Sequence, residues 1–366
     1  MGFAFKSSIL EALAATKVPQ GASQTEAWQE VKIAPLVPSS AMLKAKAPVG
    51  FAILAKQKRE SKPQYDYINP VTGLPMENAP SRPVAVIINN LKKATPQVGI
   101  SNYELLFEYP AEGEITRLVN VMYDYSKITE LGSVRSIRDY FIVGALPLDP
   151  VFIHYGHSPS AAKYISENPV TSLNGIRGDI DRQLFWRDAK REQQMGFEHS
   201  VLTSSVRIDR TFAAFNVRST TEKTEPFFDF SGWPQGGFRA ESLKVQFIQG
   251  MTGTFTWDGS KYLRSQFGAP QVDGTDGSQL TCDTVIVIKT YCKNIPGDAD
   301  LRRRCDLVGA GSGYVFANGE GFEINWSKAA DSEFFVFTYK DGKTTTINPG
   351  KVWICVMDTS RSVVYE

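Results

Sequence analysis

The feature that most constrains the fold is a change of pattern between residues 219 and 242. Before this segment, short apolar runs typical of buried strands alternate with runs of helical spacing. After it, nearly every signal is a strand followed by a turn, and the turns include Asp-Gly and Asn-Gly pairs that favour tight hairpins. We therefore expect an α+β fold, in which a mixed α/β N-terminal domain is followed by a smaller β-rich domain packed against it.

The elements expected in the first half can be placed individually. The run VAVIIN follows Arg82-Pro83 without a polar break, as in a strand that is buried on both faces. Ser158-Pro159 supplies a helix cap followed by proline at the first helical position. The patterns predict strands at 84–89, 104–109, 114–125 and 151–155, and helices at 136–146, 160–167 and 204–215.

Residues 1–62 differ in composition from the rest of the chain. They carry nine Lys and Arg against four Glu, no Asp and four prolines, which predicts a basic, largely unstructured leader. Neither this segment nor any later one has the roughly 18 consecutive apolar residues of a membrane-spanning helix. The expected organisation is a leader at 1–62, an α/β domain at 63–218, a linker at 219–242 and a β-rich domain at 243–366.

The net charge limits the class of protein. The chain has 40 Lys and Arg against 39 Asp and Glu, without the basic excess of a protein devoted to nucleic acid. Its four cysteines all lie in the last quarter, without a CxxC spacing and without a histidine after residue 199, so a zinc site is not predicted. Cys292 and Cys305 are the first choice for a disulfide, and free buried thiols are the alternative for these two and for Cys282 and Cys355.

The segment HYGHSPSAAKYI, at 154–165, has the clearest cluster of polar residues. A strand, a glycine turn and a helix start follow one another here, which is where α/β proteins place ligands, and free N–H groups at a helix start attract anions. The hydrolase pattern GxSxG is not met, because Pro159 has no N–H to offer an oxyanion. Ser158 is therefore interpreted as a helix cap.

The histidines and arginines gather in the same half. His154, His157 and His199 fit site lining, a general base or structural roles better than a metal site, since no HExxH-type pair exists. Arginines at a helix start oppose the macrodipole, so those at 135 and 138 indicate either ion pairs or a bound carboxylate or phosphate. Glu108 and Glu114 are weak candidates for acid–base work with His154.

Many motifs of the chain occur together in one known order. They include NPVTGLP (69–75), RPVAVIINNLKKATPQVGIS (82–101), FEYPAEGEITRL (107–118), ELGSVRSIRDYFI (130–142), FIHYGHSP (152–159), LFWRD (184–188), RSQFGAPQVD (264–273) and TINPGKVWICVM (346–357). In these the chain resembles the YerB-like family of bacterial lipoproteins, a family of domains of unknown function, over residues 66–358. The resemblance implies an α/β and a β-rich domain in an exported, membrane-associated protein. This chain departs from it in lacking a clear signal peptide and a lipidation cysteine.

The matching motifs supply the residues of a candidate pocket. The predicted ligand-binding residues are Asn89, Arg117, Arg135, Ser136, Arg138, His154, His157, Ser158, Arg187 and His199, with Asp188 beside them. The preferred hypothesis is a cell-envelope protein that binds an anionic component there, such as a peptidoglycan fragment or phosphorylated glycan. The alternatives are an envelope hydrolase or transferase that uses a Glu/His pair, and a protein–protein interaction module with a free strand edge after residue 243. No cofactor and no metal are predicted, and the oligomeric state is left open.

Overall fold

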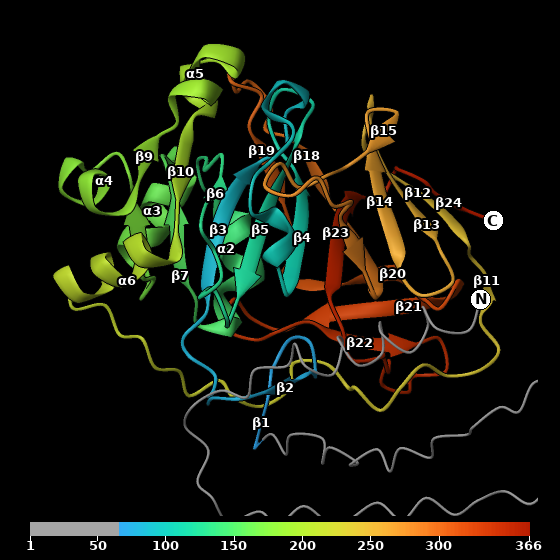
Figure 1. The fold of residues 1–366 in the computed structure, drawn as a ribbon. Helices are drawn as coiled ribbons and strands as arrows, with labels where there is room; N and C mark the ends of the chain where they lie inside the picture. The colour runs from blue at the N-terminus through green and yellow to red at the C-terminus, as the bar shows by residue number, and fades with distance from the viewer. Residues whose placement is uncertain (1–65) are drawn as a thin grey trace, which may run out of the picture. The chain divides into compact units, whose positions relative to one another are not determined.

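One sheet of eleven strands runs through both halves of the chain (Figure 1). The computed structural model describes residues 66–366, so the leader predicted at 1–62 lies outside it. In chain order the strands of this sheet are β3 (Val84–Asn89), β4 (Leu105–Pro110), β5 (Thr116–Met122), β7 (Val151–His154), β8 (Ser172–Asn174), β11 (Phe238–Arg239), β17 (Thr284–Thr290), β20 (Gly309–Ala317), β21 (Glu320–Lys328), β22 (Val336–Tyr339) and β23 (Val352–Asp358). They lie in the order β11-β21-β20-β17-β23-β4-β5-β3-β7-β8, with β22 beside β21.

The two halves meet inside this sheet, where β23 pairs in parallel with β4. All residues of both strands are buried, as expected for parallel strands covered on both faces, and this explains the continuous apolar sequence VWICVM. The β-rich half is thus joined to the α/β half by backbone hydrogen bonds as well as by side-chain packing. The segment predicted as a linker, 219–242, leads from one half to the other and contains β11.

The described part of the first half has the helices α2 (Asp139–Ala145), α3 (Pro159–Glu167), α4 (Gly178–Leu184), α5 (Ala189–Met195) and α6 (Ser205–Ala214), of which α5 packs on the 3₁₀ turn Phe197–His199. Helices α2 and α3 pack on one face of β3, against Ala85 and Ile87, and α4 and α6 pack on the side of Val84, Val86 and Ile88. Side chains alternate along a strand, so one apolar run serves both cores. Helices α2, α3 and α6 were predicted. Helices α4 and α5 were not, because α4 buries only two apolar residues and α5 buries none, too few to show an apolar helical pattern.

A second sheet of six strands lies beside the first in the β-rich half. Its strands are β12 (Ser242–Ile248), β13 (Met251–Trp257), β14 (Tyr262–Gln266), β15 (Ala269–Pro270), β16 (Thr281–Cys282) and β24 (Val363–Tyr365). The predicted Asp258-Gly259 turn joins β13 to β14, and Asn318-Gly319 joins β20 to β21 with both residues at positive φ.

Three small sheets complete the described part of the chain. They pair β1 (Tyr67–Ile68) with β2 (Pro75–Met76), β10 (Val201–Thr203) with β6 (Leu131–Gly132) and β9 (Trp186–Arg187), and β18 (Cys292–Asn294) with β19 (Arg303–Cys305). Cys292 and Cys305 face each other across the last pair and form the expected disulfide, with Cα atoms 4.1 Å apart. Cys282 and Cys355 are free, buried thiols.

Candidate functional site

The predicted site lies where β3 and β7 separate at their carboxyl ends. The two strands pair in parallel over three residues, and beyond that point the chain segment 133–138 enters between them. Arg135 N donates to Ile87 O at 2.8 Å, and Tyr155 N donates to Arg135 O at 3.0 Å. Such a separation of parallel strands is a usual ligand position in α/β folds. Here the chain's own backbone fills the space between the two strands.

Two buried arginines of the predicted site share one carboxylate. Arg117 Nη2 lies 2.6 Å from Glu112 Oε1, and Arg138 donates to both oxygens of the same group, with its Nε 3.1 Å from Oε2. Burial raises the pKa of Glu112, but the charges of Arg117 and Arg138 outweigh it and hold that pKa at about 2. Burial and then the Arg138 charge lower the pKa of Arg117 to about 9.

Arg135 and Arg187 lie together on the 3₁₀ turn Phe197–His199. Arg135 Nη1 donates to Glu198 O at 2.8 Å, and Arg187 Nη1 donates to the preceding carbonyl, Phe197 O, at 2.7 Å. Arg135 also pairs with the exposed Glu198 carboxylate at 3.1 Å. Arg135 directly precedes Ser136, whose carbonyl oxygen accepts from Arg117 Nη1 at 2.8 Å, so Arg135 lies beside the first pair.

Arg187 is the member of the group without an acidic partner: within residues 66–366 it forms no ion pair. Its guanidinium carbon lies 3.5 Å from the centre of the Phe197 ring and 5.3 Å from that of Tyr155, so aromatic faces hold the charge in place. The four guanidinium groups contact two carboxylates in all, and we call them the arginine row: Arg117, Arg135, Arg138 and Arg187.

Asn89 and His199 border the arginine row. Asn89 Nδ2 lies 2.9 Å from His199 Nδ1, and Asn89 Oδ1 accepts from Leu91 N at 3.1 Å, which orients the amide with its nitrogen toward the ring. The ring proton is therefore assigned to Nε2, 3.8 Å from Glu198 Oε1. Burial, assisted by the charge of Arg135, lowers the pKa of His199 despite Glu198, so the ring is neutral at pH 7.

His154 has a structural environment. Its Nδ1 lies 2.7 Å from Gly156 O and its Nε2 lies 2.6 Å from Ser172 Oγ. Burial lowers the pKa of His154 to about 4, which keeps the ring neutral at physiological pH. With both ring nitrogens hydrogen bonded and the side chain fully buried, His154 is not presented to a ligand.

The remaining predicted residues of this region position the backbone. Ser136 Oγ donates to Tyr155 O at 3.0 Å, and Ser158 Oγ accepts from Ala161 N at 3.1 Å as the predicted cap of α3. His157 is exposed beside them. Asp188 likewise caps α5, accepting from Arg191 N at 2.7 Å.

The two carboxylates considered for acid–base chemistry do not meet His154. Glu108 is fully buried and binds Arg264 of the other half, with oxygens 3.0 and 3.1 Å from Nη2. Glu114 occupies a turn at φ 56° and lines a different surface hollow, beside Arg303. The structure therefore does not form the Glu/His pair that an envelope hydrolase or transferase was expected to use.

A second polar cluster, centred on Asn90, was missed by the sequence analysis. Asn90 follows Asn89 directly, so the two side chains leave the strand end on opposite sides. Asn90 Oδ1 accepts from three glutamine amides, and Asn90 Nδ2 donates to Thr116 Oγ1 at 2.7 Å and to Glu108 Oε1 at 3.3 Å. The donors are Gln97 Nε2 at 2.8 Å, Gln266 Nε2 at 2.9 Å and Gln271 Nε2 at 3.4 Å. Their only sequence signal is their place in the NNLKKATPQ and RSQFGAPQVD motifs.

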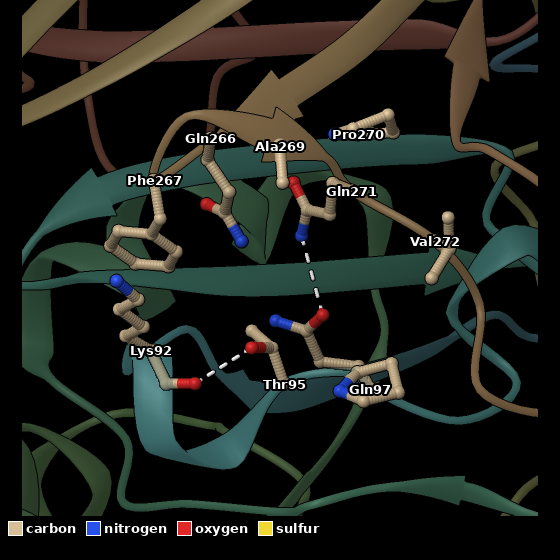
Figure 2. A pocket seen from close by; sticks show the side chains of 10 residues that line it. Lys92, Thr95, Gln97, Gln266, Phe267, Ala269, Pro270, Gln271 and Val272 are labelled. Atoms are coloured by element: carbon tan, nitrogen blue, oxygen red, sulfur yellow. Dashed lines mark hydrogen bonds between the residues drawn. The ribbon is translucent and has the colours of Figure 1, made fainter.

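These glutamines form the floor of a pocket of about 190 Å³ between the two halves (Figure 2). One wall is the loop 92–97 of the first half and the other is the β14–β15 turn with the residues that follow it. The walls are tied together, because Gly274 N donates to Gln97 O at 2.6 Å and the Asp273 carboxylate accepts from Gly99 N at 2.9 Å. The lining residues are Lys92, Thr95, Pro96, Gln97, Gln266, Phe267, Ala269, Pro270, Gln271 and Val272.

The described residues also bear on three expectations, which concern metal sites, membrane-spanning helices and free strand edges. No group of three or more His, Cys, Asp or Glu side chains within residues 66–366 is arranged to hold a metal ion. No helix of that range is long and apolar enough to cross a membrane. An interaction module was expected to leave a strand edge free after residue 243. In the described part of the chain β24 pairs only with β12, whereas the outer edge of β22 is hydrogen bonded by residues 343–345.

Comparisons with known proteins agree with the motifs. Residues 71–218 match the family model for the N-terminal domain, and residues 243–354 that for the C-terminal domain, of the proteins of unknown function named DUF3048. The chain is 30% identical over 295 residues to "Putative lipoprotein YerB" of Bacillus subtilis (strain 168), which covers 79% of this chain and 85% of that protein. A crystal structure of the Bacillus subtilis YerB protein superimposes with a TM-score of 0.70 at 28% identity, covering 81% of this chain and 99% of that one. The chain therefore belongs to the DUF3048 family of proteins of unknown function.

Proposed function

We propose that this chain is a binding protein of the bacterial cell envelope whose arginine row takes an anionic group. The suggested ligands are the carboxylates of a peptidoglycan fragment or the phosphates of a wall glycan. The envelope assignment is carried over from the relative, whose name describes it as a lipoprotein. The anionic ligand is argued from the residues of this chain.

The observation that carries the proposal is the shortage of negative charge at the arginine row. Arg117 and Arg138 share Glu112, Arg135 has the exposed Glu198, and Arg187 has aromatic rings and neutral oxygens around it. A guanidinium group grips a carboxylate or phosphate through two parallel N–H bonds, which are about twice as strong as bonds between neutral groups. A ligand anion at Arg135 and Arg187 would supply the missing charge.

The test replaces Arg135 and Arg187, the two members of the arginine row that do not pair with Glu112. Purified peptidoglycan fragments and phosphorylated wall glycan are titrated against the parent chain, Arg135→Gln/Arg187→Gln, and the control Arg239→Gln/Arg304→Gln. The control removes equal charge from exposed arginines that pair with Glu241 and Asp306. We expect the row variant to bind about tenfold or more weakly, since a charged hydrogen bond contributes roughly 1.5–3 kcal/mol.

Ionic strength gives a second readout. Raising the salt concentration weakens an exposed charge interaction, so the affinity of the parent chain should fall with salt and that of the row variant should fall less. Equal loss in the row variant and in the control, or no binding of either polymer by the parent, would remove the support for an anionic ligand at this site.

A further inference from the structure

A buried carboxylate below the pocket of Figure 2 determines how the side-chain amides of the pocket floor are oriented. Glu108 is held by Arg264 and only accepts hydrogen bonds, so the amide nitrogen of Asn90 faces it, at 3.3 Å from Oε1. The Asn90 oxygen consequently faces the other way, toward the glutamines. All three glutamines donate to this oxygen through Nε2, and Gln266 in return accepts from Asn90 Nδ2 through Oε1 at 3.0 Å.

Gln271 is the least satisfied member of this network. Its nitrogen reaches Asn90 Oδ1 and Gln97 Oε1 only at 3.4 Å each, and both neighbours are acceptors, so the amide cannot turn round. Its oxygen has no hydrogen-bond partner although the residue is 3% exposed. Figure 2 shows this oxygen turned away from Gln97, toward Ala269 of the pocket wall. An unpaired buried acceptor is costly, and a donor brought by a ligand would relieve that cost.

The pocket wall formed by the β14–β15 turn is apolar. Its aromatic residue, Phe267, has an unfavourable backbone conformation. Phe267 has a φ of 54°, in the left-handed region where a bulky residue is rare. The next residue, Gly268, also has positive φ, so a glycine at 267 would fit this turn without strain. Strained residues of this kind cluster at ligand sites. Pro96 and Val272 add apolar surface around the amides.

We infer that this pocket binds a sugar residue that carries an acetamido group. The secondary amide of that group supplies an N–H to the unpaired Gln271 oxygen. Its methyl group matches the apolar surface of Pro96 and Val272, and the face of the sugar ring matches the ring of Phe267. At about 190 Å³ the pocket is smaller than the roughly 300 Å³ of typical small-molecule sites, which suits one sugar residue at a chain end.

This site is separate from the arginine row and does not rest on the function proposed above. Asn89 faces the row and Asn90 faces the pocket, and the ligand inferred here needs no charge. A neutral probe consequently tests the pocket alone.

The experiment titrates the full chain with the β-1,4-linked trimer of N-acetylglucosamine by calorimetry and by saturation transfer to the acetyl methyl groups. Cellotriose, which has hydroxyls in place of acetamido groups, is the matched ligand control. N-acetylalanine methylamide offers a secondary amide without a sugar. We expect the acetylated trimer to bind, and cellotriose and the peptide amide to bind at least about tenfold more weakly, a difference of roughly 1.4 kcal/mol.

Two variants and one control address the chain. Phe267→Gly removes the ring and relieves the backbone, so its Tm should not fall below that of the parent while its affinity for the trimer falls about tenfold. Gln271→Leu keeps the bulk but removes both polar atoms, and should have a similar effect on affinity. Tyr67→Ala removes an aromatic ring that is 42% exposed elsewhere, and should leave the affinity unchanged.

Three outcomes would overturn the inference. One is no binding of the trimer at about 10 mM. Another is equal affinity for cellotriose or for the peptide amide, which would make the acetamido sugar the wrong ligand. The third is parent-like affinity in Phe267→Gly, which remains decisive even if Gln271→Leu fails to fold.

Discussion

Glu108 of β4 and Arg264 of β14 form an ion pair in which neither side chain is exposed to water. The pair joins the two halves of the chain, with 3.0 Å between Glu108 Oε2 and Arg264 Nη2. The rings of Phe255 and Trp353 lie 4.9 and 5.2 Å from the guanidinium group, and Trp353 Nε1 donates to the carboxylate at 3.1 Å. A buried charge needs a partner, so each of these residues makes the other tolerable in the core.

Arg264→Met should be strongly destabilising, because it leaves the Glu108 carboxylate buried without its cation. Breaking a buried pair from one side costs about 3–5 kcal/mol, and we expect a loss of that size in the free energy of unfolding measured with urea. The double variant Glu108→Gln/Arg264→Met removes the stranded charge as well. It should recover at least about 1 kcal/mol relative to the single variant. A double variant no more stable than Arg264→Met would show that lost packing, and not an unpaired charge, is the cost.

Glu112 should stabilise the fold at neutral pH and lose this effect in acid. Its pKa is about 2 in the folded chain against an ordinary value of 4.5, so the folded state holds the ionised form more strongly than the unfolded state does. The contribution is complete above pH 4.5 and disappears as the pH falls toward 2. With its side chain 20% exposed, we expect roughly 2–3 kcal/mol. The difference in unfolding free energy between the parent and Glu112→Gln should therefore narrow over that range, and a constant difference would contradict the assignment.

His154 should make the fold sensitive to mild acid. Burial lowers its pKa from 6.5 to about 4, so between these values the unfolded chain takes up a proton that the folded chain excludes. Stability is unaffected above pH 6.5 and falls by up to about 3 kcal/mol as the pH approaches 4. His154→Gln lacks this proton uptake, although it loses hydrogen bonds at every pH. The gap between parent and variant should therefore be widest at pH 7 and shrink toward pH 4, while a gap that widens in acid would exclude the mechanism.

The sequence predicted those parts of the fold whose signal is local. The apolar run of β3 and the Ser158-Pro159 start of α3 are properties of a few neighbouring residues, and both elements form where expected. The parallel pairing of β23 with β4 joins residues about 250 positions apart, and no local pattern specifies such a partner. The sheet that unites the two halves was therefore invisible in the sequence.

The same distinction applies to the two polar sites. The arginines had a local signal, because cations at a helix start oppose the macrodipole and so indicate an anionic partner for Arg135 and Arg138. Gln97 and Gln271 are 174 residues apart and carry no charge. Neither their spacing nor their chemistry therefore predicted the amide cluster. Glu108 was a candidate for acid–base chemistry because of its place in the chain. Its ion-pair partner Arg264 lies 156 residues away, so no local pattern indicated the buried pair.

The disulfide between Cys292 and Cys305 should contribute measurably to stability. The two cysteines are 13 residues apart and close the loop between β18 and β19, and cross-linking a loop of this length constrains the unfolded chain by about 3 kcal/mol. Reducing the parent chain should lower its free energy of unfolding by roughly that amount. Cys292→Ala/Cys305→Ala should have the stability of the reduced parent and should not respond to reductant, which provides the control, since Cys282 and Cys355 are free in every form. A parent whose unfolding curve is the same with and without reductant would mean that this disulfide does not stabilise the folded chain.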